Sequence, residues 1–290
     1  MDYPEELENQ ELSRMITIDN IDIHLREPAS SDCTWIGQAE AFRLLSAAWM
    51  KMHAKDKIMT PVLIGPPGCG KTTLACAVAK EFDRPVYLMN CTSDMRPEDL
   101  LITPVIANDS KILYRASALV TAIVNGGICV LDEANRMNEK SWASLASLLD
   151  DRRYIESVSS GTKIIAHPEF RIVATMNDDS STFTVPEYIE SRLKPVLPVE
   201  FPSLEELKAI ITHHFPFVSP ELILAAIQWL DEQKQKGTVT SYSVRDAIKL
   251  TCYAQKLTDD SKMSMDAIGR KILKVHDQPM TLKKSIFIGI

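Results

Sequence analysis

The chain has 290 residues, of which 45% are hydrophobic and 24% charged, and its formal net charge at pH 7 is −7. These values are typical of a globular protein with one large or two modest domains. The acidic balance argues against a protein that binds nucleic acid through its bulk charge.

The six cysteines form no CxxC pair and have no histidine partner at zinc spacing. They are Cys33, Cys69, Cys76, Cys91, Cys129 and Cys252. Several lie inside apolar runs, so we expect reduced thiols and no disulfide framework. The N-terminus is acidic and lacks the pattern of a signal peptide. No apolar run approaches the ~20 residues of a membrane span, so we expect a cytoplasmic protein without membrane contact.

Residues 1–32 read as an acidic N-terminal extension, for which we expect a peripheral helix and, in the alternating run 16–23, an edge strand. An apolar stripe at helical spacing then predicts a helix within 35–55. Five short apolar runs further along predict buried strands: 61–64, 86–89, 127–131, 171–175 and 196–201. Helical patterns at 72–82 and 139–149 separate some of these runs. The alternation predicts an α/β domain, a five-stranded parallel sheet with helices on both faces, over residues 33–202.

Two segments interrupt this alternation and predict β-hairpins: 104–114, with its turn at 108–110, and 154–165, with its turn near Gly161. After residue 202 the strand patterns largely stop. Ser203 opens a capping box with Glu206, and Ser219 and Ser243 are expected to cap further helices. We therefore expect a small helical domain over 203–276. The C-terminal tail, 277–290, ends in an alternating apolar run that is expected to pack on this domain, with strand addition to a partner as the alternative.

A phosphate-binding loop follows the first predicted strand. Its residues are Gly65, Pro66, Pro67, Gly68, Cys69, Gly70, Lys71 and Thr72, which match GxxxxGK[ST] between a strand and a helix. The glycines let backbone N–H groups surround phosphate oxygens, and the helix N-terminus favours negative charge. We expect Lys71 to reach the β- and γ-phosphates and the Thr72 hydroxyl to bind Mg²⁺, with Thr73 behind it also at the nucleotide. The motif predicts a nucleoside triphosphate site.

Polar residues follow three of the other predicted strands. Asp132 and Glu133 come directly after an apolar run, at the strand end where ligands bind in open α/β sheets. Asp132 is expected to hold Mg²⁺ through water and Glu133 to polarise an attacking water, although two such carboxylates could instead cap the next helix. Asn177 could align water beside the γ-phosphate, and Asn90 could either contact Glu133 or serve as a turn residue.

In this order the motifs resemble those of the AAA+ ATPases. The resemblance identifies 65–72 as Walker A, 128–133 as Walker B, Asn177 as sensor 1, Arg192 as a candidate arginine finger and Arg245 as sensor 2 in a helical lid. The run 132–136 (DEANR) and the two hairpins resemble those of the MoxR group. The runs 149–153 (LDDRR) and 166–170 (AHPEF) are most similar to the CbbQ/NorQ-type branch.

This resemblance implies ATP and Mg²⁺ as ligands and a homo-oligomer, expected to be a hexameric ring, in which Arg192 acts on ATP held by the neighbouring subunit. Arg136 and Arg152 are competing candidates for that role and Arg153 is a weaker one. The implied activity is ATP-driven remodelling of a protein client with an adaptor that carries a von Willebrand factor A (VWA) domain. A nucleotide-gated scaffold and a nucleic-acid motor or loader stay open as alternatives.

Overall fold

The computed structural model describes residues 14–29, 33–53, 55–106, 111–178, 184–238, 242–258 and 264–273. These residues fall into two compact units. The first comprises the described residues up to 66 and from 70 to 199, and the second comprises 67–69 and the described residues from 200 onward. Each unit is described by itself below.

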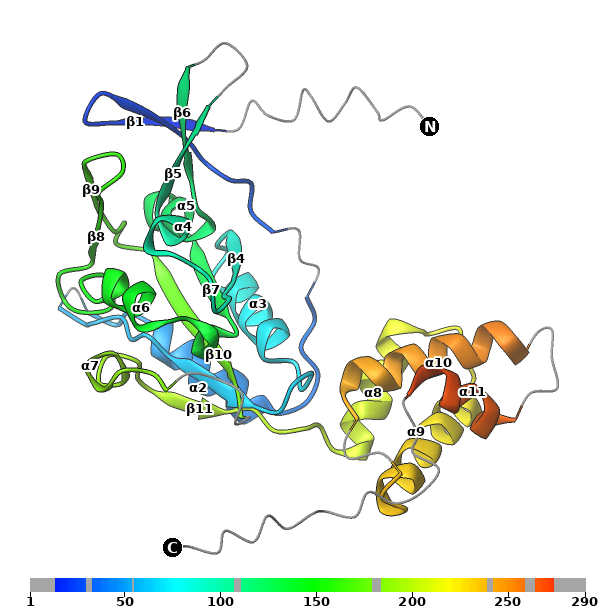
Figure 1. The fold of residues 1–290 in the computed structure, drawn as a ribbon. Coiled ribbons are helices and arrows are strands. Elements are labelled where there is room, and N and C mark those ends of the chain that lie inside the picture. The colour runs from blue at the N-terminus through cyan, green and yellow to red at the C-terminus, as the bar shows by residue number, and fades with distance from the viewer. Residues whose placement is uncertain are drawn as a thin grey trace, which may run out of the picture. The chain divides into compact units, whose positions relative to one another are not determined.

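A five-stranded parallel sheet forms the centre of the first unit (Figure 1). In spatial order its strands are β11 (Val196–Pro198), β3 (Val62–Gly65), β10 (Arg171–Asn177), β7 (Ile128–Asp132) and β4 (Val86–Asn90). All neighbouring pairs are parallel, and β7 and β10 are buried along almost their whole length, which explains their continuous apolar sequences. The predicted fold class is confirmed.

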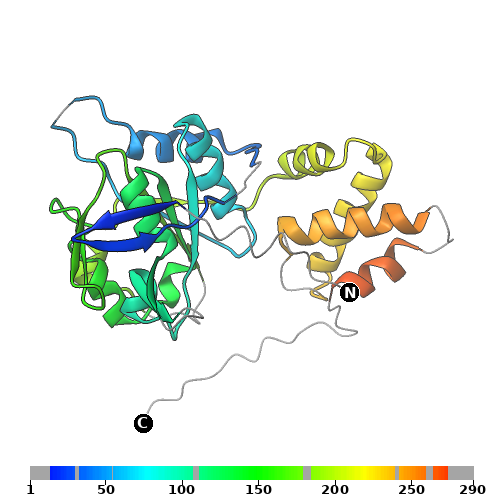
Figure 2. The ribbon, with the colours of Figure 1, turned by 90° about the horizontal axis from the view of Figure 1, so that it is seen from above.

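The helical elements of the first unit are α2 (Ala39–Trp49), α3 (Lys71–Glu81), α4 (Pro97–Leu100), α5 (Ala118–Asn125), the 3₁₀ turn η1 (Ala134–Arg136), α6 (Glu139–Leu145) and α7 (Glu187–Glu190). Helices α2 and α3 pack together beside the sheet (Figure 2). The sequence did not predict α5, because its residues are almost all apolar and show no polar stripe at helical spacing. Ser117 caps its start, and Gly126 ends it in a left-handed conformation with φ +67°.

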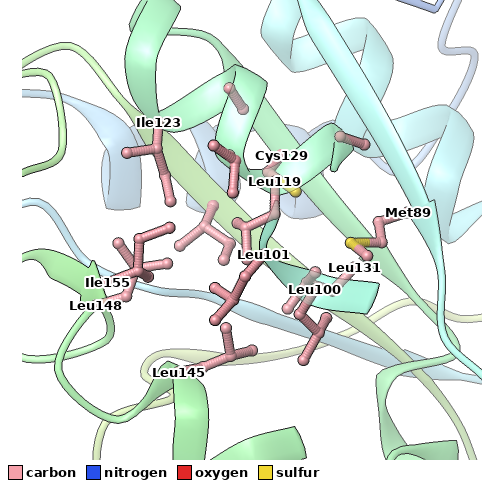
Figure 3. Close-up of a cluster of buried hydrophobic side chains, with 14 of the residues drawn as sticks. Met89, Leu100, Leu101, Leu119, Ile123, Cys129, Leu131, Leu145, Leu148 and Ile155 are labelled. Atoms are coloured by element: carbon pink, nitrogen blue, oxygen red, sulfur yellow. The ribbon is translucent and has the colours of Figure 1, made fainter. Parts of the chain in front are cut away.

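A buried apolar cluster joins α5 and the segment around α6 to the sheet (Figure 3). Leu119 and Ile123 of α5 and Leu131 of β7 belong to it, as do Leu145 and Ile155, and each is at most 1% exposed. Leu131 directly precedes Asp132, so this packing holds the carboxyl end of β7 in place. Ile155 lies in β8, so the cluster also anchors the second hairpin.

Both predicted hairpins are present. The first consists of β5 (Ile102–Ile106) and β6 (Ile112–Ala116), and its expected turn lies outside the described residues. The second consists of β8 (Tyr154–Ser157) and β9 (Thr162–Ile165), with Gly161 at φ +67° in its turn.

The prediction of a single edge strand within 16–23 is wrong. The segment forms two strands, β1 (Met15–Ile18) and β2 (Ile21–His24), because Asp19 and Asn20 adopt φ values of +48° and +64° and reverse the chain. Asp and Asn tolerate this left-handed conformation better than other non-glycine residues. Strand β2 pairs with β6 in parallel and gives a four-stranded sheet in the order β1-β2-β6-β5. The expected peripheral helix of the extension is not found in 14–29, and residues 1–13 and 30–32 lie outside the described residues.

The second unit contains α8 (Leu204–His214), α9 (Pro220–Gln235), α10 (Val244–Thr258) and α11 (Met265–Ile272), which share a core of their own. The predicted capping box is present: Ser203 Oγ accepts from Glu206 N–H, and the Glu206 carboxylate accepts from Ser203 N–H. Ser219 and Ser243 cap α9 and α10 as expected. None of the helices in the described ranges is long and apolar enough to cross a membrane.

Candidate nucleotide site

The loop between β3 and α3 has the backbone conformation of a phosphate-binding turn. Gly68 and Gly70 lie at φ +74° and +103°, where a side chain would be strained. A Cβ on Gly70 would also lie 3.1 Å from the ring of Trp35, so that the loop and the segment before α2 are in close contact. Gly70 is the N-cap of α3 and has no side chain to accept from the first N–H groups of the helix.

Lys71 opens α3 and is only 7% exposed. Its Nζ donates to the carbonyl oxygens of Gly65 and Pro66 and to Oδ1 of Asn177, each at 2.9 Å. The register explains the last contact, because Asn177 of β10 lies opposite Gly65 of β3. A buried ammonium group is thus held at the carboxyl edge of the sheet, where it can pair with a phosphate.

Asp132 ends β7 and accepts two hydroxyl hydrogen bonds at Oδ1. Thr72 Oγ1 donates to it at 2.8 Å and Thr175 Oγ1 at 2.5 Å. A hydroxyl and a carboxylate side by side are hard oxygen ligands of the kind that Mg²⁺ prefers. The structure thus brings together the two residues that the sequence assigned to the metal, and their chemistry fits the ion.

Glu133 adopts a left-handed conformation, φ +55°, which is uncommon for a residue with a side chain. Its Oε1 accepts from Asn177 Nδ2 at 3.3 Å, and its Oε2 lies 2.5 Å from Nε of Arg136. Asn177, and not the alternative Asn90, is therefore the amide that holds this carboxylate among the described residues. Lys71, Asn177, Glu133 and Arg136 form one continuous chain of contacts.

Three further residues of the site were not assigned to it from the sequence. Thr175 bridges the two Walker B residues, since its Oγ1 also accepts from Glu133 N–H at 3.1 Å. Asn135 donates from Nδ2 to the carbonyl oxygen of Asn177 at 3.0 Å. Arg136 was considered only as a contact to a neighbouring subunit. Thr175 lies two residues before Asn177, so strand alternation alone could have placed both on one face.

Arg192, the leading candidate for the trans role, has partners apart from the residues around Lys71. Arg192 follows α7; its Nη1 donates to the carbonyl oxygen of Tyr188 and its Nη2 lies 3.7 Å from Oδ2 of Asp150. In the part of the chain that the structure describes, its contacts do not include the residues around Lys71. Arg192 therefore lies outside the contact network around Lys71 of its own subunit.

Arg245 lies in the first turn of α10, in the second unit. Its role as sensor 2 stays a prediction. The same holds for Pro67, Gly68 and Cys69, which belong to the phosphate-binding loop by sequence, and for Thr73.

All six cysteines are free thiols, as expected. Cys91 follows β4 directly, and burial, together with the nearby carboxylates of Asp132 and Glu133, raises its pKa to about 12. Burial raises the pKa of the Cys129 thiol as well. The described residues contain no group of three or more His, Cys, Asp and Glu side chains that could together hold a metal ion.

Comparison with known proteins agrees with this geometry. Residues 61–193 match the family model of the AAA domain (dynein-related subfamily). The chain is 34% identical over 118 residues to the denitrification regulatory protein NirQ of Pseudomonas aeruginosa, covering 40% of this chain and 45% of NirQ. It is 32% identical over 181 residues to protein NorQ of Paracoccus denitrificans, covering 62% of each. The matched region thus spans less than two thirds of the length of these relatives.

Among solved structures, a mutant of Thermotoga maritima RuvB shares the fold, with a TM-score of 0.54, 23% sequence identity, and coverage of 83% of this chain and 70% of that one. The structure titled as the RuvB Holliday junction branch migration motor of the same organism gives a TM-score of 0.51 at 22% identity, with coverage of 82% and 69%. These likenesses concern the fold alone. The fold is that of an AAA P-loop ATPase, and the ordered motifs and the match of residues 61–193 agree with the similarity of the chain to NirQ and NorQ.

Proposed function

We propose that this protein is a ring-forming ATPase that uses ATP hydrolysis at its subunit interfaces to remodel a protein client. The observation that carries the proposal is the contact chain at the sheet edge. Lys71 Nζ holds Oδ1 of Asn177, and Nδ2 of the same amide holds Glu133. A phosphate-binding cation, a neutral amide and a carboxylate suited to act as a base are thus linked by one side chain.

The arrangement supports a defined division of roles in hydrolysis. Lys71 would bind the β- and γ-phosphates, and Asn177 would orient the attacking water. Glu133 would take the proton of that water as its oxygen bonds to the γ-phosphorus and the bond from that phosphorus to the ADP oxygen breaks. Thr72, and Asp132 through water, would hold Mg²⁺, which supplies charge neutralisation when bound. Arg245 would contact the γ-phosphate from the helical lid.

The position of Arg192 supports a ring with shared sites. Its contacts to Tyr188 and Asp150 are separate from the network around Lys71, which supports an action on ATP held by a second copy of the chain. Arginine fingers of this kind contribute ~10³–10⁵ in rate in GTPases. We propose a homo-oligomer, hexameric by resemblance to the AAA+ ATPases, and a subunit that is a poor enzyme alone.

The client and the adaptor would bind to the two hairpins. Ile106 and Ile112, a cross-strand pair beside the turn of the first hairpin, are 78% and 60% exposed, and Val158 at the end of the second is 95% exposed. Exposed apolar side chains on projecting strands are suited to grip a protein segment. A VWA-domain protein is the proposed adaptor, by resemblance to the CbbQ/NorQ-type branch.

The substitution Glu133→Gln tests the proposal, because it removes the base and keeps the size of the side chain. We expect ATP binding to persist and steady-state turnover to be lost, together with biological function. Retention of function without turnover would favour the nucleotide-gated scaffold. Stimulation of the wild-type ATPase by DNA or RNA, weakening steeply with salt, would favour the nucleic-acid motor instead. Proteins that co-purify with the ATP-bound Glu133→Gln variant would identify the client and the adaptor.

A further inference from the structure

Asp150 is the one carboxylate that two of the four candidate arginines share in the described structure. Arg152 makes a close pair with it, with Nη2 at 2.7 Å from Oδ2 and Nε at 3.1 Å from each carboxylate oxygen. Arg192 approaches the same Oδ2 at 3.7 Å. Both arginines lower the pKa of the Asp150 carboxyl, Arg152 the more strongly through its hydrogen bonds.

The other two candidate arginines, Arg136 and Arg153, contact other residues. Arg136 is paired with Glu133 of its own subunit. Arg153 donates from Nη2 to the carbonyl oxygen of Phe170 at 2.7 Å and lies over the ring of that residue, and burial lowers its pKa. Their side chains therefore face the interior or the local site, whereas Arg152 and Arg192 remain together at Asp150.

Local structure holds Asp150 in place. Leu148 and Leu149, which precede it, are buried at 1% and 7% exposure. Oδ1 of Asp150 accepts from Arg152 N–H at 2.9 Å, which ties the carboxylate to the turn that follows. Arg192, by contrast, holds Asp150 only at the longer distance, and its Nε is buried without a hydrogen-bond partner in the described residues. The Asp150 carboxylate is thus held by the backbone and side chain of Arg152, while the Arg192 guanidinium donates to the carbonyl oxygen of Tyr188 and approaches Asp150 at the longer distance.

The position of the Asp150 carboxylate between two arginines lowers the electrostatic repulsion between them. Two guanidinium groups that converge on one phosphate repel each other, and a carboxylate between them offsets that repulsion before the ligand arrives. Groups that are already in place when charge develops stabilise a transition state without reorganisation.

We propose that Asp150 is a positioning residue that holds Arg192 and Arg152 together as a pair directed at the ATP of a neighbouring copy of this chain. This inference rests on the proposed shared site and names the second arginine of that site and the side chain that orients both.

The test is Asp150→Asn in the full-length assembled protein, with Asp151→Asn as the matched control. Asparagine keeps the size of the side chain and an oxygen for Arg152 N–H, so the turn is retained, but the negative charge is lost. Asp151 is the next residue and pairs instead with Lys57 at the surface. We expect kcat to fall ~10–100-fold for Asp150→Asn, since small misplacement of a catalytic group has such effects, with KM for ATP and oligomer size unchanged. Asp151→Asn should leave kcat unchanged.

Mixed assemblies separate this role from a merely structural one. A subunit with Asp150→Asn has an intact phosphate site, so mixing it with Lys71→Ala subunits should restore turnover, as should mixing Arg192→Ala with Lys71→Ala. Recovery with Arg192→Ala but not with Asp150→Asn would overturn the role of Asp150 and leave the shared site standing. Recovery in neither mixture would overturn the shared site and this proposal with it. Equal loss of kcat in Asp151→Asn would also contradict it.

Discussion

At the scale of single residues, both oxygens of the Glu133 carboxylate have partners. Asn177 contacts one and Arg136 the other. Asn177 is also the partner of Lys71, so a phosphate that attracts Lys71 loosens that side of the network. Arg136 would then be the remaining restraint on the base, and its pair with Glu133 is 44% and 45% exposed.

This predicts that Arg136→Ala raises the basal ATPase rate. An exposed ion pair contributes ~0.2–1 kcal/mol, so freeing Glu133 should increase turnover by at most about fivefold, with little change in the free energy of unfolding. Steady-state ATPase assays check this, and Arg136→Lys, which keeps the charge, should remain close to wild type. A large loss of activity would show that Arg136 instead acts on the neighbouring ATP.

A second residue prediction concerns Gly70. Gly70→Ala places a Cβ at φ +103° and 3.1 Å from the Trp35 ring. The loop must shift, so ATP binding measured with a fluorescent analogue should weaken more than tenfold, and the intrinsic tryptophan fluorescence should change. Unaltered affinity would contradict the close packing of this loop. Gly161→Ala serves as the control, because it has a similar left-handed φ of +67° but open space around it, far along the chain in the second hairpin.

Sequence reasoning predicted that Lys71, Thr72, Asp132, Glu133 and Asn177 would meet, and they do. It succeeded because Asp132, Glu133 and Asn177 lie at strand ends, and the carboxyl ends of neighbouring parallel strands form one edge. Lys71 and Thr72 open the helix that follows β3, so they lie at the same edge. The contact of Arg136 with Glu133 could not be predicted in this way. It depends on the left-handed backbone of Glu133, which turns η1 so that the side chain three residues on reaches back.

At the scale of elements, the sequence predicted those with a local pattern and missed those that depend on burial or on pairing with distant residues. Amphipathic or capped helices such as α2 and α8 were predicted because their patterns are local. Helix α5 was missed because it is buried on nearly all sides. Strands β1 and β2 were merged because the conformations of Asp19 and Asn20, and the pairing with β6 about 90 residues away, are not visible in an alternating run.

Helix α5 supplies the element-scale prediction. Ser117 Oγ accepts from Val120 N–H at 3.0 Å and donates to the carbonyl oxygen of Leu100 at 2.7 Å, both within the core. Ser117→Ala should therefore lower the free energy of unfolding by ~1–3 kcal/mol, since it removes a cap and leaves a buried carbonyl without its donor. Urea denaturation followed by circular dichroism checks this. Ser203→Ala, at the exposed cap of α8, should cost less, and an equal cost would contradict the role of burial.

At the scale of the whole molecule, the buried thiols predict a loss of stability at alkaline pH. The pKa of Cys91 is about 12 in the folded chain against an ordinary value of 9.0. The folded state therefore keeps a proton that the unfolded state releases above pH 9, so this contribution is fully present below pH 9 and is lost between about pH 9 and 12. The denaturant concentration at the midpoint of unfolding should fall as the pH rises through this range, and Cys91→Ala should make this fall with pH less steep. The same slope in both proteins would contradict the assignment.

The central claim is that each ATP site is completed by a second copy of the chain. Mixing Arg192→Ala subunits with Lys71→Ala subunits tests it most directly, because each variant lacks a different half of the site. Each should be inactive alone, and an equal mixture that assembles at random should regain turnover at about a quarter of its interfaces, as expected for head-to-tail contacts. A mixture as inactive as its components, or an Arg192→Ala protein with wild-type turnover, would contradict the shared site.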